Sequence, residues 1–144
     1  MQIRKINLIG VLVLILALSI TISHFIAAVA IIGIPVIISL TTGLVMFTNN
    51  DFSIVIKAVI AYLCIGLNDV GIKLFAGGIH DYEGLGWINM MLFIGLVPSI
   101  IMLLIGTFRN KNSTIWIKLS SILLFAALIG IHFFLFTKLG VHEN

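Results

Sequence analysis

The feature that most constrains this chain is a run of apolar residues from Ile6 to Phe47, whose main polar interruption is Ser23-His24. A membrane-spanning helix needs about twenty residues, because each residue adds about 1.5 Å along the axis and the hydrocarbon layer is about 30 Å thick. The run is too long for one span. It therefore predicts a helical hairpin that turns at Ser23-His24.

The rest of the chain continues this pattern, since 61% of its 144 residues are hydrophobic and only 9% are charged. A soluble domain has about a quarter of its residues charged, and a small soluble fold cannot bury this much apolar surface. Spanning segments must be helices or closed barrels. Barrel strands are segments of roughly ten residues in which apolar and polar positions alternate, and this sequence has longer, continuous apolar runs instead. We therefore predict an all-α polytopic integral membrane protein with one domain, residues 1–144, embedded in the lipid bilayer.

Polar segments divide the chain into apolar stretches of spanning length. We predict a bundle of about five transmembrane helices, with spans at residues 6–23, 26–47, 53–75, 87–108 and 114–137. A Gly-rich loop, residues 76–86, separates the third span from the fourth. A cleaved signal peptide is an alternative for the first span, because Ala28-Val29-Ala30 resembles a cleavage site. The apolar character continues unbroken through that site, which favours a retained span.

Basic residues flank these spans, and their distribution predicts the orientation. With the N-terminus in the cytoplasm, the cytoplasmic ends collect six of the eight basic residues, as the positive-inside rule requires: Arg4, Lys5, Lys57, Arg109, Lys111 and Lys118. This orientation explains the net charge of +3 without nucleic acid, which we do not expect as a partner. It also places all four histidines and four of the five acidic residues on or near the outer side. We predict a multi-pass protein of a bacterial plasma (inner) membrane, because the composition is rich in Ile, Asn and Lys.

The third span carries the most informative polar residues, Asn68, Asp69 and Lys73. Asp69 and Lys73 are i,i+4 neighbours on a helix and can pair. Ionisable groups inside a span are costly and mark ion, proton or ligand sites by default. The competing interpretation is a neutralised structural pair, with Asn68 bonded to a neighbouring helix. The sequence leaves both interpretations open.

The Gly-rich loop brings together His80, Asp81 and Glu83, and His132 near the outer end of the fifth span could join them. Nitrogen and oxygen ligands of this kind can bind a divalent metal, although the spacing matches no strong metal motif. The competing interpretation is a solvated polar turn, with His132 as a hydrogen-bonding residue between helices. We expect no cofactor, and a divalent metal is the alternative.

These observations allow three functions. The first is an accessory, interaction or inhibitory (immunity-type) subunit of a membrane assembly, with a protein partner or a second copy of the chain in the membrane. The alternative is a small transporter or ion-coupled permease that uses Asp69 and Lys73. The third is a membrane enzyme acting on a lipid, with a metal in the 80–83 loop. The lack of any catalytic motif favours a non-enzymatic role.

Overall fold

The computed structural model describes residues 5–49, 51–76 and 81–140, and in this part of the chain every regular element is an α-helix. The helices are α1 (Lys5–Phe25), α2 (Ala27–Phe47), α3 (Ile54–Phe75), α4 (Tyr82–Arg109) and α5 (Ile115–Phe136). All five are long and apolar enough to cross a membrane. The predicted all-α class and number of helices are therefore confirmed.

The first helix ends later than predicted. It continues through the expected turn at Ser23-His24 to Phe25, because the Ser23 hydroxyl donates to the carbonyl of Ile20 within the same helix, at 2.7 Å. The chain leaves the helical conformation only at Ile26, which has φ −139° and ψ 72°. A polar residue that bonds to its own helix does not end it.

The fourth helix begins earlier than predicted, at Tyr82, so that it has 28 residues. Asp81 causes this difference: its Oδ1 accepts a hydrogen bond from the backbone N–H of Gly84 at 2.7 Å and caps the first turn. The predicted loop at residues 76–86 is therefore helical from Tyr82 onward.

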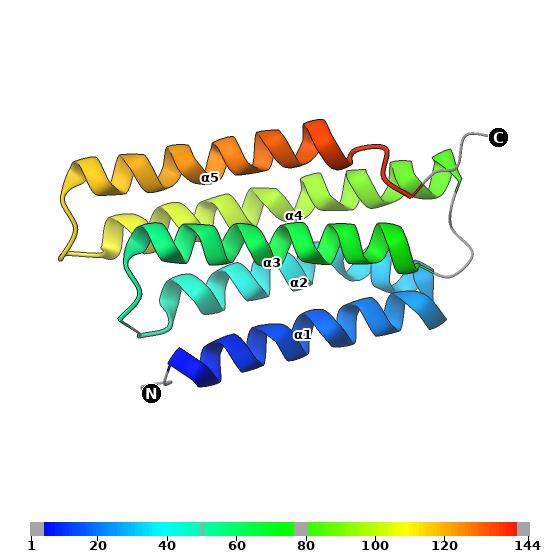
Figure 1. Ribbon diagram of the computed structural model, residues 1–144, viewed down its shortest axis with the longest axis horizontal. Helices are drawn as coiled ribbons and strands as arrows, with labels where there is room; N and C mark the ends of the chain where they lie inside the picture. Colours follow the sequence, from blue (N-terminus) through cyan, green and yellow to red (C-terminus); the bar gives the residue numbers. More distant parts are fainter. Residues whose placement is uncertain (1–4, 50, 77–80, 141–144) are drawn as a thin grey trace.

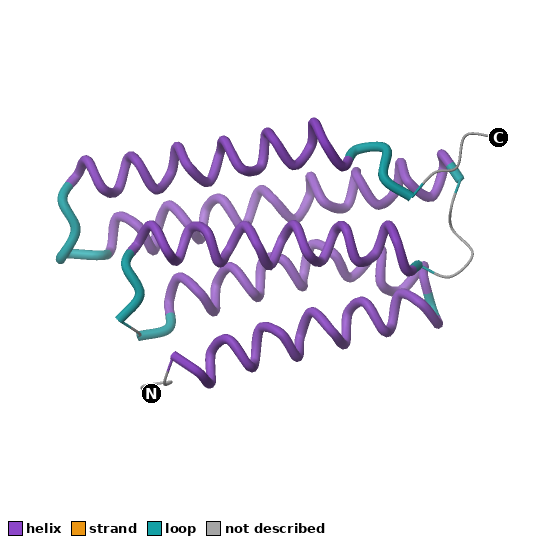
Figure 2. The backbone as a smooth tube through the Cα atoms, in the orientation of Figure 1, coloured by secondary structure: helices purple, strands orange, loops and turns teal. Residues whose placement is uncertain are grey.

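The helices lie side by side and alternate in direction along the chain (Figure 1 and Figure 2). One end of the bundle holds the start of α1, the turn between α2 and α3, and the turn between α4 and α5. We call it the basic end because it carries Lys57, Arg109, Lys111 and Lys118. The opposite end holds the link between α1 and α2 and the turn that follows α5.

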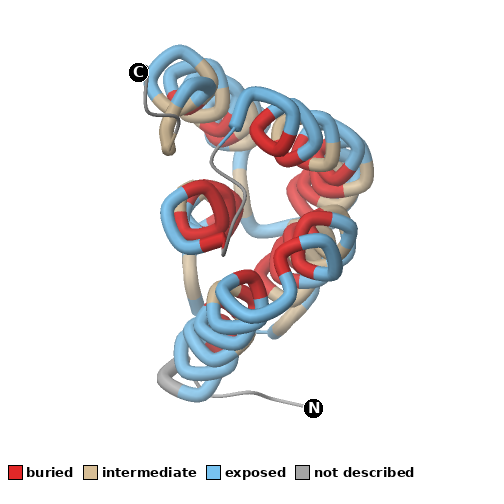
Figure 3. Tube along the Cα trace, turned by 90° about the vertical axis from the view of Figure 1, so that its right-hand side faces the viewer, coloured by how far each residue is buried: buried red, intermediate tan, exposed pale blue. Residues whose placement is uncertain are grey.

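Helix α3 packs against each of the other four helices. It also has the largest buried share of the five. In the end-on view the buried residues of the helices are turned toward the interior of the bundle (Figure 3). Helix α5 has the smallest buried share and packs mainly on α3 and slightly on α4. Within the described residues it makes no close backbone approach to α1 or α2. Contacts between α3 and α5 therefore decide how α5 is held.

The outside of the bundle is apolar, with large exposed side chains such as Phe25, Trp116 and Phe134, the last of which is 88% exposed. Water would penalise such a surface at about 25 cal/mol per Å² of apolar area, whereas lipid tails do not. The described part of the chain has the architecture of a helical membrane bundle.

Candidate functional site

A buried charged cluster lies where α3 meets α5, and Asp69 is its centre. The side chains of Asp69 and Lys73 share one face of α3, because residues four apart are neighbours on a helix. Lys73 Nζ lies 2.7 Å from Asp69 Oδ2, and the two side chains are only 0% and 1% exposed, Asp69 being the fully buried one. The predicted i,i+4 pair is confirmed, and it is fully shielded.

Helix α5 supplies the second half of the cluster. His132 Nε2 lies 2.9 Å from Asp69 Oδ2, the same oxygen that Lys73 contacts. Lys73 Nζ also donates to the backbone carbonyl of Phe136 at 3.0 Å. His132 and Phe136 are one turn apart, so an i,i+4 pair of α3 faces an i,i+4 pair of α5. We call Asp69, Lys73 and His132 the Asp69 cluster.

The imidazole of His132 lies directly against the backbone of α3. A Cβ added at Gly66 would lie 3.4 Å from His132 Nδ1, in van der Waals contact with the ring. Two aromatic rings also surround the imidazole: Tyr62 meets it edge-on at 6.1 Å between centroids, and Phe136 lies at 5.0 Å. This enclosure fixes the ring with Nε2 toward Asp69.

Asn68 faces a different helix. Its Oδ1 accepts a hydrogen bond from Ser19 Oγ of α1 at 2.8 Å, and both residues are buried. The contact from Asn68 to a neighbouring helix, which the competing structural interpretation expected, is therefore present. Two successive residues of α3 thus connect it to α1 on one side and to α5 on the other.

Three buried polar atoms in this region have no hydrogen-bond partner among the described residues: Asp69 Oδ1, Asn68 Nδ2 and His132 Nδ1. Leaving a buried polar atom without a partner costs about 1–3 kcal/mol, and more for a charged group. Such atoms are rare in folded proteins and often mark redox, catalytic or ion-binding positions. The Asp69 cluster therefore has hydrogen-bonding capacity that the described part of the chain does not use.

The turn that follows α5 covers the Asp69 cluster at the end of the bundle away from the basic end. Asn89 Nδ2 of α4 donates to the carbonyl of Thr137 at 3.1 Å, which holds the turn after α5 against α4. Gly140, with φ +90°, brings that turn so close to the carbonyl of Lys73 that a Cβ there would collide with it. The backbone both bends and closes over Lys73 because this residue is glycine.

The residues predicted to bind a metal are not brought together by the described part of the structure. His80 lies outside the described residues, Asp81 caps α4, and Glu83 is exposed in the first turn of α4. His132 contacts Asp69 instead. Across the described residues no group of three or more His, Cys, Asp or Glu side chains could hold a metal ion. The metal site stays an untested prediction, because His80 is one of its proposed ligands.

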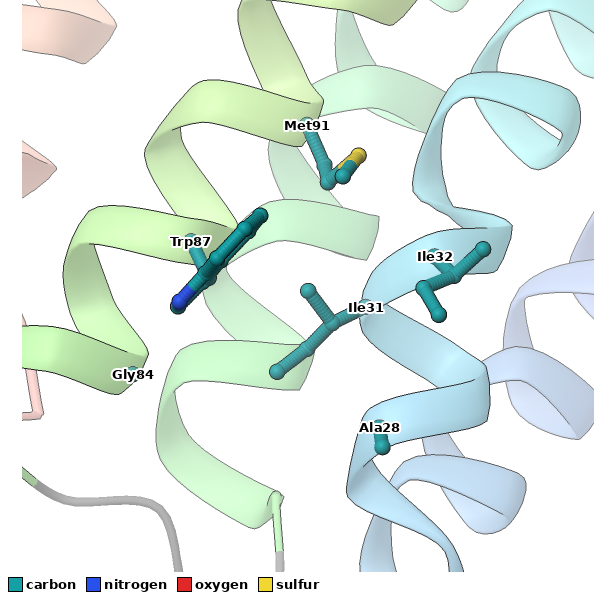
Figure 4. Close-up of a pocket in the computed structure, with 6 residues that line it drawn as sticks. All are labelled: Ala28, Ile31, Ile32, Gly84, Trp87 and Met91. Carbon is teal, nitrogen blue, oxygen red and sulfur yellow. The ribbon is translucent and has the colours of Figure 1, made fainter.

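A cavity of about 360 Å³ lies between the starts of α2 and α4, at the end of the bundle away from the basic end. Ile31 and Trp87 face each other there (Figure 4). Its lining residues are Ala28, Ile31, Ile32, Gly84, Trp87 and Met91, none of them titratable. Trp87 lies near the start of α4. The cavity has room for an apolar group, and its lining residues include no acid, base or nucleophile.

Sequence reasoning missed the contact between His132 and Asp69. The pattern contained a clue, because two ionisable side chains inside separate apolar spans lower their cost when they pair with each other. Comparison with protein-family models, with curated proteins and with solved structures gave no significant match, so the site is interpreted from its own geometry.

Proposed function

We propose that this chain is a multi-pass membrane protein of the ion-coupled permease class, in which the Asp69 cluster binds and releases a proton. One observation carries the proposal: Asp69 is fully buried, gives one oxygen to both Lys73 and His132, and has a second oxygen without a partner among the described residues. Chains of acidic and histidine side chains inside the membrane serve as proton relays in pumps and transporters.

The charge of the cluster explains why a proton would act as a switch. An ionised Asp69, a charged Lys73 and a neutral His132 have no net charge together. One further proton, on Asp69 or on His132, leaves a net positive charge in an apolar interior, where an uncompensated charge is expensive. The cluster must then open, or an anion or a carboxylate of a substrate must balance the charge.

Helix α5 is the element best placed to respond. Two of its contacts with α3, from His132 to Asp69 and from Phe136 to Lys73, depend on the charge of the cluster. The only other titratable side chain against His132 in the described structure is Tyr62, which contacts the ring by its edge. A proton on Asp69 removes the negative charge that His132 and Lys73 share, and it therefore weakens the attachment of α5 to α3.

The orientation belongs to the same proposal. The basic end faces the cytoplasm, in accord with the positive-inside rule, and the Asp69 cluster then lies in the outer half of a bacterial plasma membrane. A proton would reach the cluster from outside past the turn that follows α5. Accessibility of cysteines introduced at Lys111 and at Lys138 to a membrane-impermeant reagent tests this orientation, with only Lys138 expected to react in intact cells.

Infrared spectroscopy of the protein in liposomes tests the proton site. We expect a carboxylic acid band that appears on acidification and is absent from Asp69→Asn, whereas Asp51→Asn, a matched change at an exposed acid outside the cluster, retains it. Proton flux driven by a substrate gradient, followed with a trapped pH dye, is expected to disappear in Asp69→Asn. An unchanged band and unchanged flux in Asp69→Asn would contradict the proposal.

A second function, an accessory or interaction subunit, is favoured by a separate observation. An apolar cavity of about 450 Å³ lies between α4 and α5, lined by residues that include Phe93, Val97, Ile100, Phe125 and Gly130. A Cβ added at Gly130 would meet nothing within 4 Å, so the surface is open there. Small residues such as Gly130 permit close approach of a helix from another chain.

Co-purification distinguishes the two functions. If the chain is an interaction subunit, a partner or a second copy should co-purify with it at fixed stoichiometry in mild detergent. Gly130→Leu should abolish this co-purification. Gly33→Leu should retain it, although a Cβ added at Gly33 would likewise meet nothing within 4 Å. A protein that is monomeric and still shows proton-coupled flux argues against the interaction role.

A further inference from the structure

A polar cavity of about 340 Å³ opens at the basic end of the bundle, between the end of α2, the start of α3 and the end of α4. Its polar lining includes Thr48, Asn49, Lys57, Arg109 and Asn110, and its apolar lining comes from Met46, Phe47 and Ile54. Asn49 and Arg109 are exposed, so the cavity is open to the surface. Its volume is at the low end of the roughly 300–1,000 Å³ found for small-molecule sites.

Lys57 is the most informative residue of this cavity. It is only 7% exposed, and its Nζ donates to the carbonyl of Thr48 at 3.1 Å. Among the described residues Lys57 forms no ion pair with a carboxylate, unlike Lys73, which pairs with Asp69. A carbonyl satisfies one N–H of the ammonium but does not neutralise its charge. A buried ammonium of this kind is stabilised by an anion.

Arg109 adds a second cation to the same cavity, and Asn49 and Asn110 add side-chain amides that can donate. A guanidinium is suited to phosphate, because its planar fork of N–H groups matches two phosphate oxygens. Asp51, the acid nearest in sequence, does not line the cavity. The lining therefore offers two cations and amide donors around a space large enough for one phosphate group.

We propose that this cavity binds a phosphate group, supplied by the headgroup of an anionic phospholipid or by free phosphate. The lining changes from apolar side chains to cations within one cavity at the ends of the helices, as the boundary between acyl chains and headgroups does. Basic cavities between membrane helices bind anionic headgroups by this arrangement. The inference does not depend on the Asp69 cluster, which lies at the opposite end of α3.

Native mass spectrometry of the intact protein, purified in mild detergent with phosphatidylglycerol or phosphatidylcholine of matched chains, tests the proposal. Both lipids carry a phosphodiester, but only the first is a net anion. We expect retention of phosphatidylglycerol over phosphatidylcholine, and a loss of about fivefold in this preference for Lys57→Met and again for Arg109→Gln, because one basic residue contributes about 1 kcal/mol to anionic lipid binding. Lys111→Met is the matched control, since this exposed lysine of the α4–α5 turn does not line the cavity.

Inorganic phosphate forms the second arm. Displacement of phosphatidylglycerol by millimolar phosphate, with tight binding of phosphate to lipid-free protein, would assign the site to free phosphate; retention of the lipid would assign it to the headgroup. Equal retention of the two lipids by the native protein, together with no phosphate binding, would overturn the proposal. So would a preference that Lys111→Met lowers as much as Lys57→Met. If Lys57→Met fails to fold, the exposed Arg109→Gln decides the outcome.

Discussion

The two ends of α3 hold the same residue type in opposite surroundings. Lys73, in the last turn, is 2% exposed, lies against Asp69 at 2.7 Å and donates to a carbonyl of α5. Lys57, in the first turn, is 7% exposed and has a carbonyl of the α2–α3 turn as its partner, with no acid within ion-pair distance in the described residues. Within the described residues, the charge of Lys73 is balanced by an acid and the charge of Lys57 is not.

This difference separates two roles of buried charge in a membrane bundle. A cluster whose charges balance one another, such as that of Asp69, can remain inside the bundle. An ammonium such as Lys57, which has no counter-charge among the described residues, would be stabilised by an anion. Removing one partner of a buried pair is costly, whereas removing a charge that has no counter-charge relieves a cost.

The largest expected effect comes from Asp69→Ala. It leaves Lys73 buried without its counter-charge and His132 without its acceptor, and breaking such a pair costs about 4–5 kcal/mol, the upper part of the range for buried pairs. Thermal unfolding in mild detergent measures the loss. The double variant Asp69→Leu, Lys73→Met removes both charges and should recover much of the stability. If it is as unstable as Asp69→Ala, the cost does not come from the unbalanced charge.

The next effect compares the two lysines directly. Lys73→Met leaves an uncompensated carboxylate and is expected to cost about 3 kcal/mol at neutral pH, less than Asp69→Ala because His132 remains as a partner. Lys57→Met is expected to be neutral or stabilising in detergent that lacks anionic lipid. The same unfolding measurement serves both variants. Equal losses of stability would remove the distinction between the two ends of α3.

Acidification sharpens the same test. In Lys73→Met a proton on Asp69 or His132 restores neutrality, so the folded state binds more protons than the unfolded state. Stability of this variant relative to the native protein then increases as the pH falls. Lys57→Met, which leaves no unbalanced acid, should show no such gain. Parallel pH profiles of the two variants would argue against a neutral Asp69 cluster.

A smaller effect is expected where α3 meets α1. Ser19→Ala removes the hydroxyl that donates to Asn68 Oδ1 and leaves this buried oxygen without a partner, at a cost of about 1–2 kcal/mol. Thr21→Ala is the control, because the hydroxyl of Thr21 bonds to the carbonyl of Ala17 on the exposed side of the same helix. Equal stability of the two variants would mean that the Ser19–Asn68 contact does not hold α1.

Local periodicity predicts one half of the Asp69 cluster and not the other. The i,i+4 spacing of Asp69 and Lys73 determines their pairing within one helix. His132 is 63 residues away from Asp69 along the chain, and no spacing rule relates the rotation of α5 to that of α3. Lys57 was likewise identified only as a basic residue of the cytoplasmic side. Its burial beside the ends of α2 and α4 follows from how the helices pack.

The number of helices was predictable because span length is set by the thickness of a bilayer. Their ends were less so, since these depend on single side chains. Ser23 bonds within its helix and fails to end it, whereas Asp81 bonds to the next turn and begins one. The same short polar side chains favour either outcome, and the backbone conformation around them decides which.

The smallest expected effect is at the start of α3. Ser53 caps this helix by accepting from the N–H of Ile56 at 3.3 Å, a long bond at an exposed position, so Ser53→Ala should cost about 0.5 kcal/mol, the low end for a cap. Thr114→Ala is the control, because Thr114 occupies the same position of α5 without a side-chain cap bond. Unfolding with and without phosphatidylglycerol measures both. Ser53 does not line the cavity that contains Lys57, so its effect should be the same in both conditions; an effect that grows with the lipid would extend the phosphate site to the first turn of α3.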